Sequence, residues 1–443
     1  MNDRPDAVAA HPEHQRLPVG RSLAYGLQHI LTMYGGLIAP PIIVGGAAGL
    51  TDADIALLIS ASIFLSGLAT VLQSLGVPYF GAKLPIVQGI SFAAVPTMAT
   101  IAGTEGLPPI FGAMLVAGIV GVGIAPLFAR VIVLFPPVVT GSIITVIGLS
   151  LLPVAVDWIV GDDPHPDGSG SPRDIALAGL TVAVIVVASR LFHGVAARLA
   201  VLFGLVVGTL VAVAIGAGTF AAVGDGPLIA APPLLHFGAP TFELGAIVAM
   251  LIVMVVILTE TTADLLAVGE IIGTPVDSRR LADGLRADMA SSTVAAVVGS
   301  FPCSAFGQNV GLVALTRVSS RYVVAWGGGI LVLLGVLPVV GRVVAAIPLP
   351  VLGGAGIVLF GSLVSAGIKT LGSVRFDANL NLVLVAVTVG VGMVPIAAPG
   401  FWGRFPSGVQ VVLNSGISAA ALVAVTLNIF FNIWRRTPER TAR

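Results

Sequence analysis

The chain has 443 residues, and its 21 basic and 21 acidic side chains give a net charge of zero. Only 9% of the residues are charged, against roughly 25% in soluble proteins, while 56% are hydrophobic. These values exclude a string of soluble domains and a basic nucleic-acid binder. The single cysteine, Cys303, excludes an internal disulfide and a thiolate metal cluster. The chain is predicted to be an all-α polytopic membrane protein that has the lipid bilayer as a partner.

Both ends of the chain are predicted to be polar tails. Residues 1–20 contain several charged and histidine side chains and lack the apolar core of a signal peptide. They are therefore predicted to be disordered. Residues 435–443 follow the last apolar stretch and form the second predicted tail.

Fourteen stretches are apolar and approach the roughly 20 residues that a helix needs to cross a bilayer. They are 22–44, 54–76, 84–101, 110–130, 133–153, 174–191, 198–220, 244–272, 282–299, 303–318, 320–338, 350–369, 379–396 and 409–433. If the N-terminus lies in the cytoplasm, only Arg173, Arg342 and Arg404 of the 21 basic residues fall on the external side of the membrane. Cytoplasmic loops are enriched in Lys and Arg, so both termini are predicted to lie in the cytoplasm, and the longest loop, near 154–173, outside.

The third and tenth stretches are short and interrupted. In each, a proline (Pro85, Pro302) is followed by a glutamine beside a glycine (Gln88, Gln308), and the two glutamines lie about half a chain apart. Short broken segments at matching places in two halves are typical of transporter binding sites, and halves of seven spans would be inverted because seven is odd. Unwound backbone at this depth lines a cavity or is buried in protein. The alternative is that both segments are kinks without a ligand.

Carboxylates within the apolar stretches are candidate functional residues. Glu260 and Asp264 lie four residues apart and therefore share one helix face. A carboxylate at the bilayer centre costs about 2.5–3.5 kcal/mol, so its presence needs a reason, and a protonatable acid in a transporter indicates proton coupling. For Asp264, the alternative is a structural hydrogen bond to a neighbouring helix.

Two further polar residues allow more than one interpretation. Asp288, near the start of the ninth stretch, is either a buried proton relay or an interfacial acid that balances Arg286. His29 lies inside the first stretch beside Gln28, and a lone histidine there is more often a packing residue than a ligand. No second histidine lies near it in sequence, so no metal site is expected.

The amide side chains of Gln308 and Asn309 offer hydrogen-bond donors and acceptors together. A planar heterocycle such as a nucleobase presents the complementary edges. Glu260 would accept from ring N–H groups, and Phe92 or Phe306 would stack on the ring. On this chemistry alone, a polar amino acid or a small anion is nearly as compatible.

The run Gln308-Asn309-Val310-Gly311-Leu312-Val313-Ala314-Leu315-Thr316-Arg317 resembles the signature of the nucleobase–ascorbate transporter family (nucleobase:cation symporter-2). That signature has Asn-x-Gly after Gln, Glu or Pro, and ends in Thr followed by Arg, Lys or Gly. Gln28-His29, Gln88-Gly89-Ile90-Ser91-Phe92 and Glu260 also fall where the family has its motifs. The resemblance covers about residues 20–435.

The resemblance implies fourteen spans in two inverted repeats, with short strands at 86–90 and 304–308 in the broken spans. It implies a core domain moving against a gate domain in a homodimer, with a proton as coupling ion and no cofactor. The core would comprise 21–130 and 244–338, and the gate 131–243 and 339–434. Glu260 and Gln308 would hold the base, with Ser91, Phe92, Ala305, Phe306 and Asn309 around it. His29, Gln88, Asp264 and Asp288 would support affinity or proton coupling.

The choice of base rests on fewer residues. Glu260-Thr261 and Gln308 resemble the xanthine and urate branch, whose eighth span often reads Glu-Thr-Thr-Gly-Asp. Here Ala263 replaces the glycine of that pattern, and its methyl would narrow the approach of a neighbouring helix. Arg317 is common in uracil carriers, so a uracil:proton symporter is the alternative. A sulfate-permease-like anion exchanger is a more remote one, because no Lys or Arg falls at mid-membrane. A membrane enzyme is disfavoured, because the sequence has no nucleophilic dyad, zinc cluster or phosphate loop.

Overall fold

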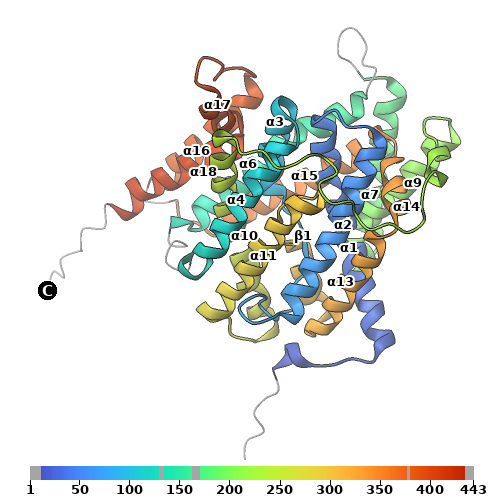
Figure 1. Cartoon of the computed structure of the whole chain (residues 1–443), viewed down its shortest axis with the longest axis horizontal. Helices are drawn as coiled ribbons and strands as arrows, with labels where there is room; N and C mark the ends of the chain where they lie inside the picture. The colour runs from blue at the N-terminus through green and yellow to red at the C-terminus, as the bar shows by residue number, and fades with distance from the viewer. Residues whose placement is uncertain (1–10, 129–133, 162–169, 377–379, 435–443) are drawn as a thin grey trace, which may run out of the picture.

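Apolar helices form most of the molecule and surround a pair of very short strands. The computed structural model describes residues 11–128, 134–161, 170–376 and 380–434. The strands are β1 (Gln88–Ile90) and β2 (Cys303–Ala305), and β1 lies near the centre of the helices in Figure 1. Segments from the two halves of the chain therefore meet in the middle of the fold.

The helices differ widely in length. In chain order they are α1 (Val19–Ala47), α2 (Asp52–Leu75), α3 (Val95–Glu105), α4 (Pro108–Ile124), α6 (Pro137–Val160), α7 (Pro172–Leu191), α8 (Val195–Arg198), α9 (Ala200–Ala214), α10 (Leu244–Ile272), α11 (Ser278–Val298), α12 (Gly307–Thr316), α13 (Arg321–Gly335), α14 (Pro338–Ala345), α15 (Leu349–Leu371), α16 (Asn381–Ala397), α17 (Ser407–Asn414) and α18 (Gly416–Asn428). Short 3₁₀ turns are η1 (Pro12–His14), η2 (Phe92–Ala94), η3 (Ala125–Leu127) and η5 (Ala221–Gly224), and a π turn, η6 (Ile429–Ile433), follows α18.

Eight helical segments in the described ranges are long and apolar enough to cross a bilayer. They are α1, α2, α6, α7, α10 and α15, together with Pro108–Leu127 and Gly416–Ile433. The pair α13 and α14 would add a ninth, although it bends by 79°. Each coincides with one of the predicted apolar stretches. The other predicted stretches contain shorter, broken or more polar helices.

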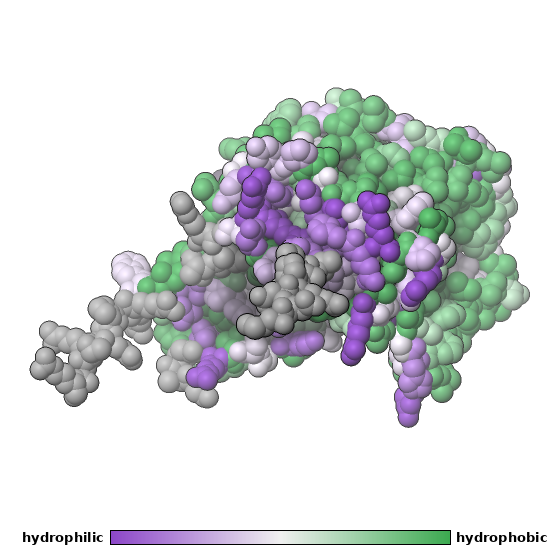
Figure 2. Space-filling model, turned by 90° about the horizontal axis from the view of Figure 1, so that it is seen from below, coloured by the Kyte–Doolittle hydropathy of each residue, from purple (hydrophilic) through white to green (hydrophobic). Residues whose placement is uncertain are grey.

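Hydrophilic side chains gather on the end of the molecule that lies below in Figure 1. Figure 2 shows this end, seen from below Figure 1, where polar residues gather beside a largely hydrophobic flank. An apolar flank and a polar end are the distribution expected when lipid surrounds the helices and water meets their ends.

Several predicted boundaries are wrong. Residues 154–160, predicted to begin an external loop, continue α6 beyond Pro153, because a proline in a membrane helix removes a single backbone hydrogen bond without ending the helix. Most of the remaining predicted loop lies outside the described residues. The last stretch is divided at Ser415, whose side chain accepts a hydrogen bond from the Ser418 backbone N–H and thereby caps α18.

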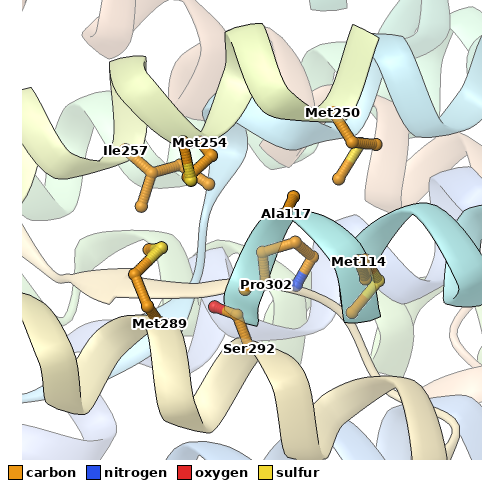
Figure 3. Close-up of a pocket in the computed structure, with 9 residues that line it drawn as sticks. Met114, Ala117, Met250, Met254, Ile257, Met289, Ser292 and Pro302 are labelled. Carbon is orange, nitrogen blue, oxygen red and sulfur yellow. The ribbon is translucent and has the colours of Figure 1, made fainter. Parts of the chain in front are cut away.

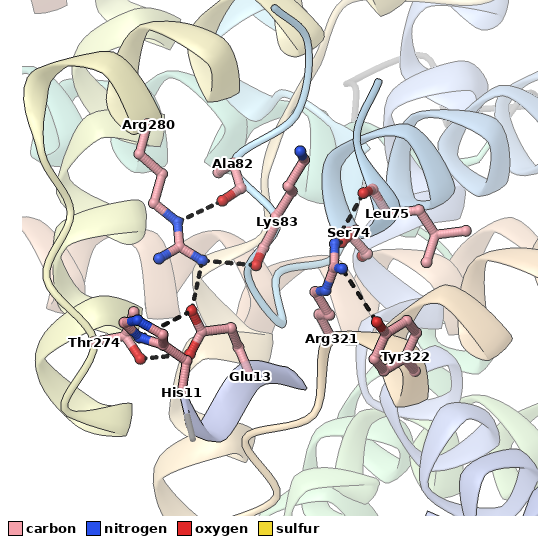
Figure 4. A network of polar contacts seen from close by, with 10 residues as sticks. All are labelled: His11, Glu13, Ser74, Leu75, Ala82, Lys83, Thr274, Arg280, Arg321 and Tyr322. Atoms are coloured by element: carbon pink, nitrogen blue, oxygen red, sulfur yellow. Dashed lines mark hydrogen bonds and ion pairs between the residues drawn. The ribbon is translucent and has the colours of Figure 1, made fainter. Parts of the chain in front are cut away.

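The prediction of a disordered N-terminal tail is wrong for residues 11–20. Glu13, in η1, is only 1% exposed and lies 3.0 Å from the Arg280 guanidinium, and it accepts a hydrogen bond from Thr274 at 2.7 Å. Arg280 also donates to the carbonyls of Ala82 and Lys83, as Figure 4 shows. The polar residues were expected to be solvated, but the buried Glu13 has a partly buried cationic partner that is distant in sequence. Residues 1–10 and 435–443 lie outside the described residues.

Candidate functional site

The site is organised around the pairing of the two broken segments. β1 and β2 are antiparallel, with Gln88 opposite Ala305 and Ile90 opposite Cys303. The Ser91 N–H donates to the Pro302 carbonyl, and Thr70 on α2 accepts from the Gln88 N–H at 2.9 Å. These bonds satisfy backbone groups that would be costly to leave unpaired within a membrane. They also hold Ser91 and Gln308 at the two ends of the strand pair.

The strands differ in extent from the predicted 86–90 and 304–308. Pairing stops at Ala305, and Gly307 already begins α12, so Gln308 and Asn309 lie in the first turn of a helix. The cause is local: the Asn309 N–H bonds back to the Phe306 carbonyl at 2.9 Å and starts the helical turn. The N-terminus of α12 therefore points its positive end toward the centre of the molecule.

A cavity of about 490 Å³ adjoins this helix start. One wall is formed by α10 and α12, with Glu260, Ala263, Asp264, Gly307 and Gln308. The facing wall comes from α6 and α15 and contributes mainly apolar side chains together with Thr140, Ser362 and Thr370. A cavity of this size with few polar groups is typical of a small-molecule site.

The structure brings the two α10 carboxylates and Gln308 to the same cavity. Glu260 and Asp264 lie on the face of α10 that lines it, as their spacing predicts. The Ser91 hydroxyl lies 3.5 Å from the Glu260 carboxylate, the outer limit for a hydrogen bond. Asp264 lies beside Gly307, where an added Cβ would be 3.4 Å from the carboxylate. Within the described chain, no Lys or Arg lines this cavity.

Other predicted site residues lie behind this wall. The amide of Asn309 bonds to His29 on α1, whose side chain is 2% exposed. Gln88 is completely buried and does not line the cavity. Its side-chain amide lies close to the Asp288 carboxylate.

The aromatic residues form a cluster instead of lining the cavity. Phe92 is 7% exposed and lies 6.5 Å, centroid to centroid, from Phe306 and 6.2 Å from Phe360 on α15. Gly36 and Gly89 pack against the Phe306 ring and leave no room for a Cβ. The cluster thus connects both broken segments to a helix of the facing wall.

Asp288 is a buried residue and not an interfacial one. Its side chain is 1% exposed, and its carboxylate accepts hydrogen bonds from Gln73 at 2.8 Å and from Thr261. Arg286, its expected counter-charge, is paired with Asp283 at 2.7 Å. The interfacial interpretation was therefore wrong, because Arg286 pairs with Asp283, one turn earlier on the same helix, and not with Asp288.

Sequence reasoning missed Gln73, Thr261 and the polar residues of the facing wall. Gln73 was detectable as a lone amide within an otherwise apolar stretch, and it is completely buried. Thr140, Ser362 and Thr370 carried no such indication, since hydroxyl side chains are common in membrane helices. The Ala263 methyl, expected to contact a neighbouring helix, is exposed toward the cavity instead.

Arg317 illustrates how the backbone explains a motif position. It ends α12 in the left-handed conformation, with φ of 54°. Glycine adopts this conformation most easily, which is consistent with a family pattern that allows Gly at the same position.

A second, small cavity has a different character. It lies between α4, α10 and α11 and is lined by Met114, Met250, Met254 and Met289 with few polar neighbours (Figure 3). Flexible thioether side chains fill irregular space in a core, so this cavity is best explained by packing. No group of three or more metal-binding side chains occurs among the residues that the structure describes.

A helical membrane fold that encloses a cavity with two carboxylates between two sets of helices is consistent with a transport protein. A family model described as a permease family matches residues 20–401. The chain therefore belongs to this permease family, nucleobase:cation symporter-2, and is a multi-pass membrane transporter and not an enzyme.

Several characterised relatives are similar over almost the whole chain. The uric acid transporter UacT of Escherichia coli is 39% identical, over 94% of this chain and 87% of that protein. The uric acid permease PucJ of Bacillus subtilis is 37% identical, over 94% of each. The xanthine permease of Bacillus subtilis is 36% identical, over 95% of this chain and 96% of that protein.

Among solved structures, the transmembrane domain of a cyanobacterial bicarbonate transporter, BicA, has a similar fold. The TM-score is 0.61 at 16% identity, covering 92% of this chain and 98% of that one. At this identity the likeness concerns the fold alone.

Proposed function

We propose that this protein takes up an oxopurine, xanthine or urate, together with protons. The observation that carries the proposal is the position of Glu260. Its carboxylate lines the same cavity as Gln308. Gln308 is the second residue of α12, the helix that starts at the broken segment. A carboxylate accepts from ring N–H groups, and an amide pairs with the adjoining carbonyl and N–H edge. Relatives named for uric acid and xanthine support this choice of base.

The remaining site residues have supporting roles. Ser91 orients Glu260, and Phe92, Ala305 and Phe306 form the back of the base site. Asn309 and His29 secure the start of α12 to α1. Asp264 and Asp288, with Gln88, take part in proton coupling, since a carboxylate within the membrane without a cationic partner is suited to binding a proton.

Transport occurs by alternating access between a core (21–130 and 244–338) and a gate (131–243 and 339–434). The cavity supports this division, because one wall comes from α10 and α12 and the other from α6 and α15. The core and gate are each built from both of two inverted seven-span repeats, giving fourteen spans in total. The protein is a homodimer in the inner membrane, with both termini in the cytoplasm.

Uptake of labelled xanthine and urate tests the function. Wild-type uptake should collapse with a protonophore, and Glu260→Gln should abolish it. Glu270→Gln is the matched control, because Glu270 lies on the same helix and is exposed. Full uptake by Glu260→Gln would exclude the carboxylate from the mechanism.

Three other substrates are included in the same assay. Strong competition by uracil would indicate the alternative function, a uracil:proton symporter, in place of an oxopurine carrier. Sulfate and bicarbonate test an anion exchanger with the shared fold, which is disfavoured because no Lys or Arg among the described residues lines the cavity.

A further inference from the structure

Asp288 is held in one orientation by a hydrogen-bond network that reaches strand β2. The Gln73 amide on α2 is fixed by the backbone: its oxygen accepts from the Ala82 N–H at 2.8 Å, and its nitrogen donates to the Gly284 carbonyl at 3.0 Å. The same nitrogen donates to Asp288 Oδ1 at 2.8 Å. Reversing the amide would place its NH2 group against the Ala82 N–H, and its oxygen against the Gly284 carbonyl and Asp288 Oδ1. The amide is therefore fixed, and Oδ1 always faces a donor.

The other carboxylate oxygen faces Thr261. The Thr261 hydroxyl donates to Asp288 Oδ2 and accepts from the Ala305 N–H at 3.2 Å. Gln73, Thr261 and Asp288 are all at most 1% exposed. A single hydroxyl thus joins the buried acid to the strand that precedes Phe306 and Gln308.

Thr261 differs from its neighbours on α10 in how its hydroxyl is used. The hydroxyls of Thr259 and Thr262 donate to the carbonyls four residues earlier, Val255 at 2.8 Å and Leu258 at 2.7 Å. This back-bonding is the usual arrangement for threonine in a helix. Thr261 instead donates across to α11, and the corresponding acceptor in its own helix would be the Ile257 carbonyl.

We infer that Thr261 is a positioning residue that transmits the protonation of Asp288 to strand β2, and that Gln73 directs the proton to the oxygen facing Thr261. Both carboxylate oxygens face a donor, but the Gln73 amide nitrogen can only donate, whereas the Thr261 hydroxyl can turn and accept. The added proton is therefore held on Oδ2. The new O–H then donates to Thr261 Oγ1, and the Thr261 hydrogen must turn to another acceptor. The bond that supports the Ala305 N–H is rearranged at the same moment. This inference rests on the proposed proton-coupled function.

Other ionisable groups near Asp288 are few. Glu260 and Asp264 face it from α10 and Cys303 from β2, whereas α4 contributes no ionisable side chain. Within the described residues, no Lys, Arg or His nitrogen pairs with the Asp288 carboxylate. The hydrogen bonds from Gln73 and Thr261 are therefore the main stabilisation of its charged form.

The test measures xanthine and urate affinity of the purified full-length protein from pH 5 to 9. Thr261→Val removes the hydroxyl with little change of shape, and should move the midpoint of the pH profile upward by about one pH unit, because the carboxylate loses a donor. Thr261→Ser should retain the wild-type midpoint. Thr262→Val is the matched control, since its hydroxyl bonds only to its own helix, and should leave the midpoint unchanged.

Two further variants make the outcome specific. Gln73→Met removes the other donor and should also raise the midpoint, which keeps the test decisive if Thr261→Val does not fold. In an Asp288→Asn background, adding Thr261→Val should no longer shift the profile. Wild-type profiles for both Thr261→Val and Gln73→Met would overturn the inference while leaving base transport intact. Absence of any base binding by the wild type would instead refute the proposed function.

Discussion

The side chain of Asn309 donates both of its amide hydrogens to a single residue, His29. Its nitrogen lies 2.9 Å from the His29 carbonyl oxygen and 3.1 Å from the ring nitrogen Nδ1. For Nδ1 to accept, the imidazole must be neutral with its hydrogen on Nε2. The first turn of α12, which carries Gln308, is thereby secured to α1.

Asn309→Leu should weaken both the fold and the site. It leaves the buried Nδ1 of His29 without its donor, which costs about 1–3 kcal/mol, and it frees the helix start beside Gln308. We expect a lower melting temperature and at least a tenfold weaker affinity for xanthine or urate, measured by thermal shift. Asn309→Asp, with the same shape and fewer donors, should show the affinity loss too. Unchanged affinity in both variants would refute the role of this contact.

Gly89→Ala should displace the Phe306 ring. A Cβ at Gly89 would lie 2.5 Å from that ring, which belongs to the aromatic cluster with Phe92. Overpacking of this kind costs about 1–3 kcal/mol, so stability and uptake should both fall. Gly329→Ala is the control, because nothing lies within 4 Å of its added methyl, and a helical Gly→Ala change should be neutral or stabilising. Equal behaviour of the two variants would argue against close packing at Gly89.

Ala263→Gly should change base preference more than affinity for any one base. The methyl lines the cavity beside Glu260. One methyl group in a pocket changes a binding free energy by about 1 kcal/mol, which corresponds to a several-fold change in the ratio of two affinities. Urate, which has one oxygen more than xanthine, should gain relative to xanthine in competition uptake. Ala267→Gly, one turn further along α10 and away from the cavity, carries the same helix penalty and should leave the ratio unchanged.

The Glu13–Arg280 contact predicts a stability that is lost in acid. Burial alone would raise the pKa of Glu13, but the hydrogen bond from Thr274 and the bonds and positive charge of Arg280 lower it below its ordinary value. The folded protein therefore binds this proton less readily than the unfolded chain, and the contribution is present at neutral pH and disappears as the pH falls through the folded-state pKa.

Melting temperatures of Glu13→Gln and wild type test this linkage. The variant should melt lower at pH 7, and the difference should shrink as the pH is lowered toward 4. The exposed residue Glu105 provides the control, and Glu105→Gln should match wild type throughout. A difference for Glu13→Gln that is the same at every pH would contradict the linkage.

The amino-acid sequence by itself determined the membrane class, most of the apolar stretches and the shared face of Glu260 and Asp264. These features depend on composition and on the repeat of a single helix, which are local properties. The breaks at Pro85 and Pro302 were also readable, because proline and glycine act on their own backbone. Their meeting as paired strands followed only from the resemblance to a family.

Only the tertiary structure decided which partners the buried polar groups have. Glu13 pairs with Arg280, and Asp288 bonds to Gln73 and Thr261. The wall that faces Glu260 across the larger cavity comes from α6 and α15. Each pairing joins segments that are distant along the chain, and helix packing brings them together. A polar side chain buried among helices must find a partner, but its own sequence neighbourhood does not specify which helix will supply it.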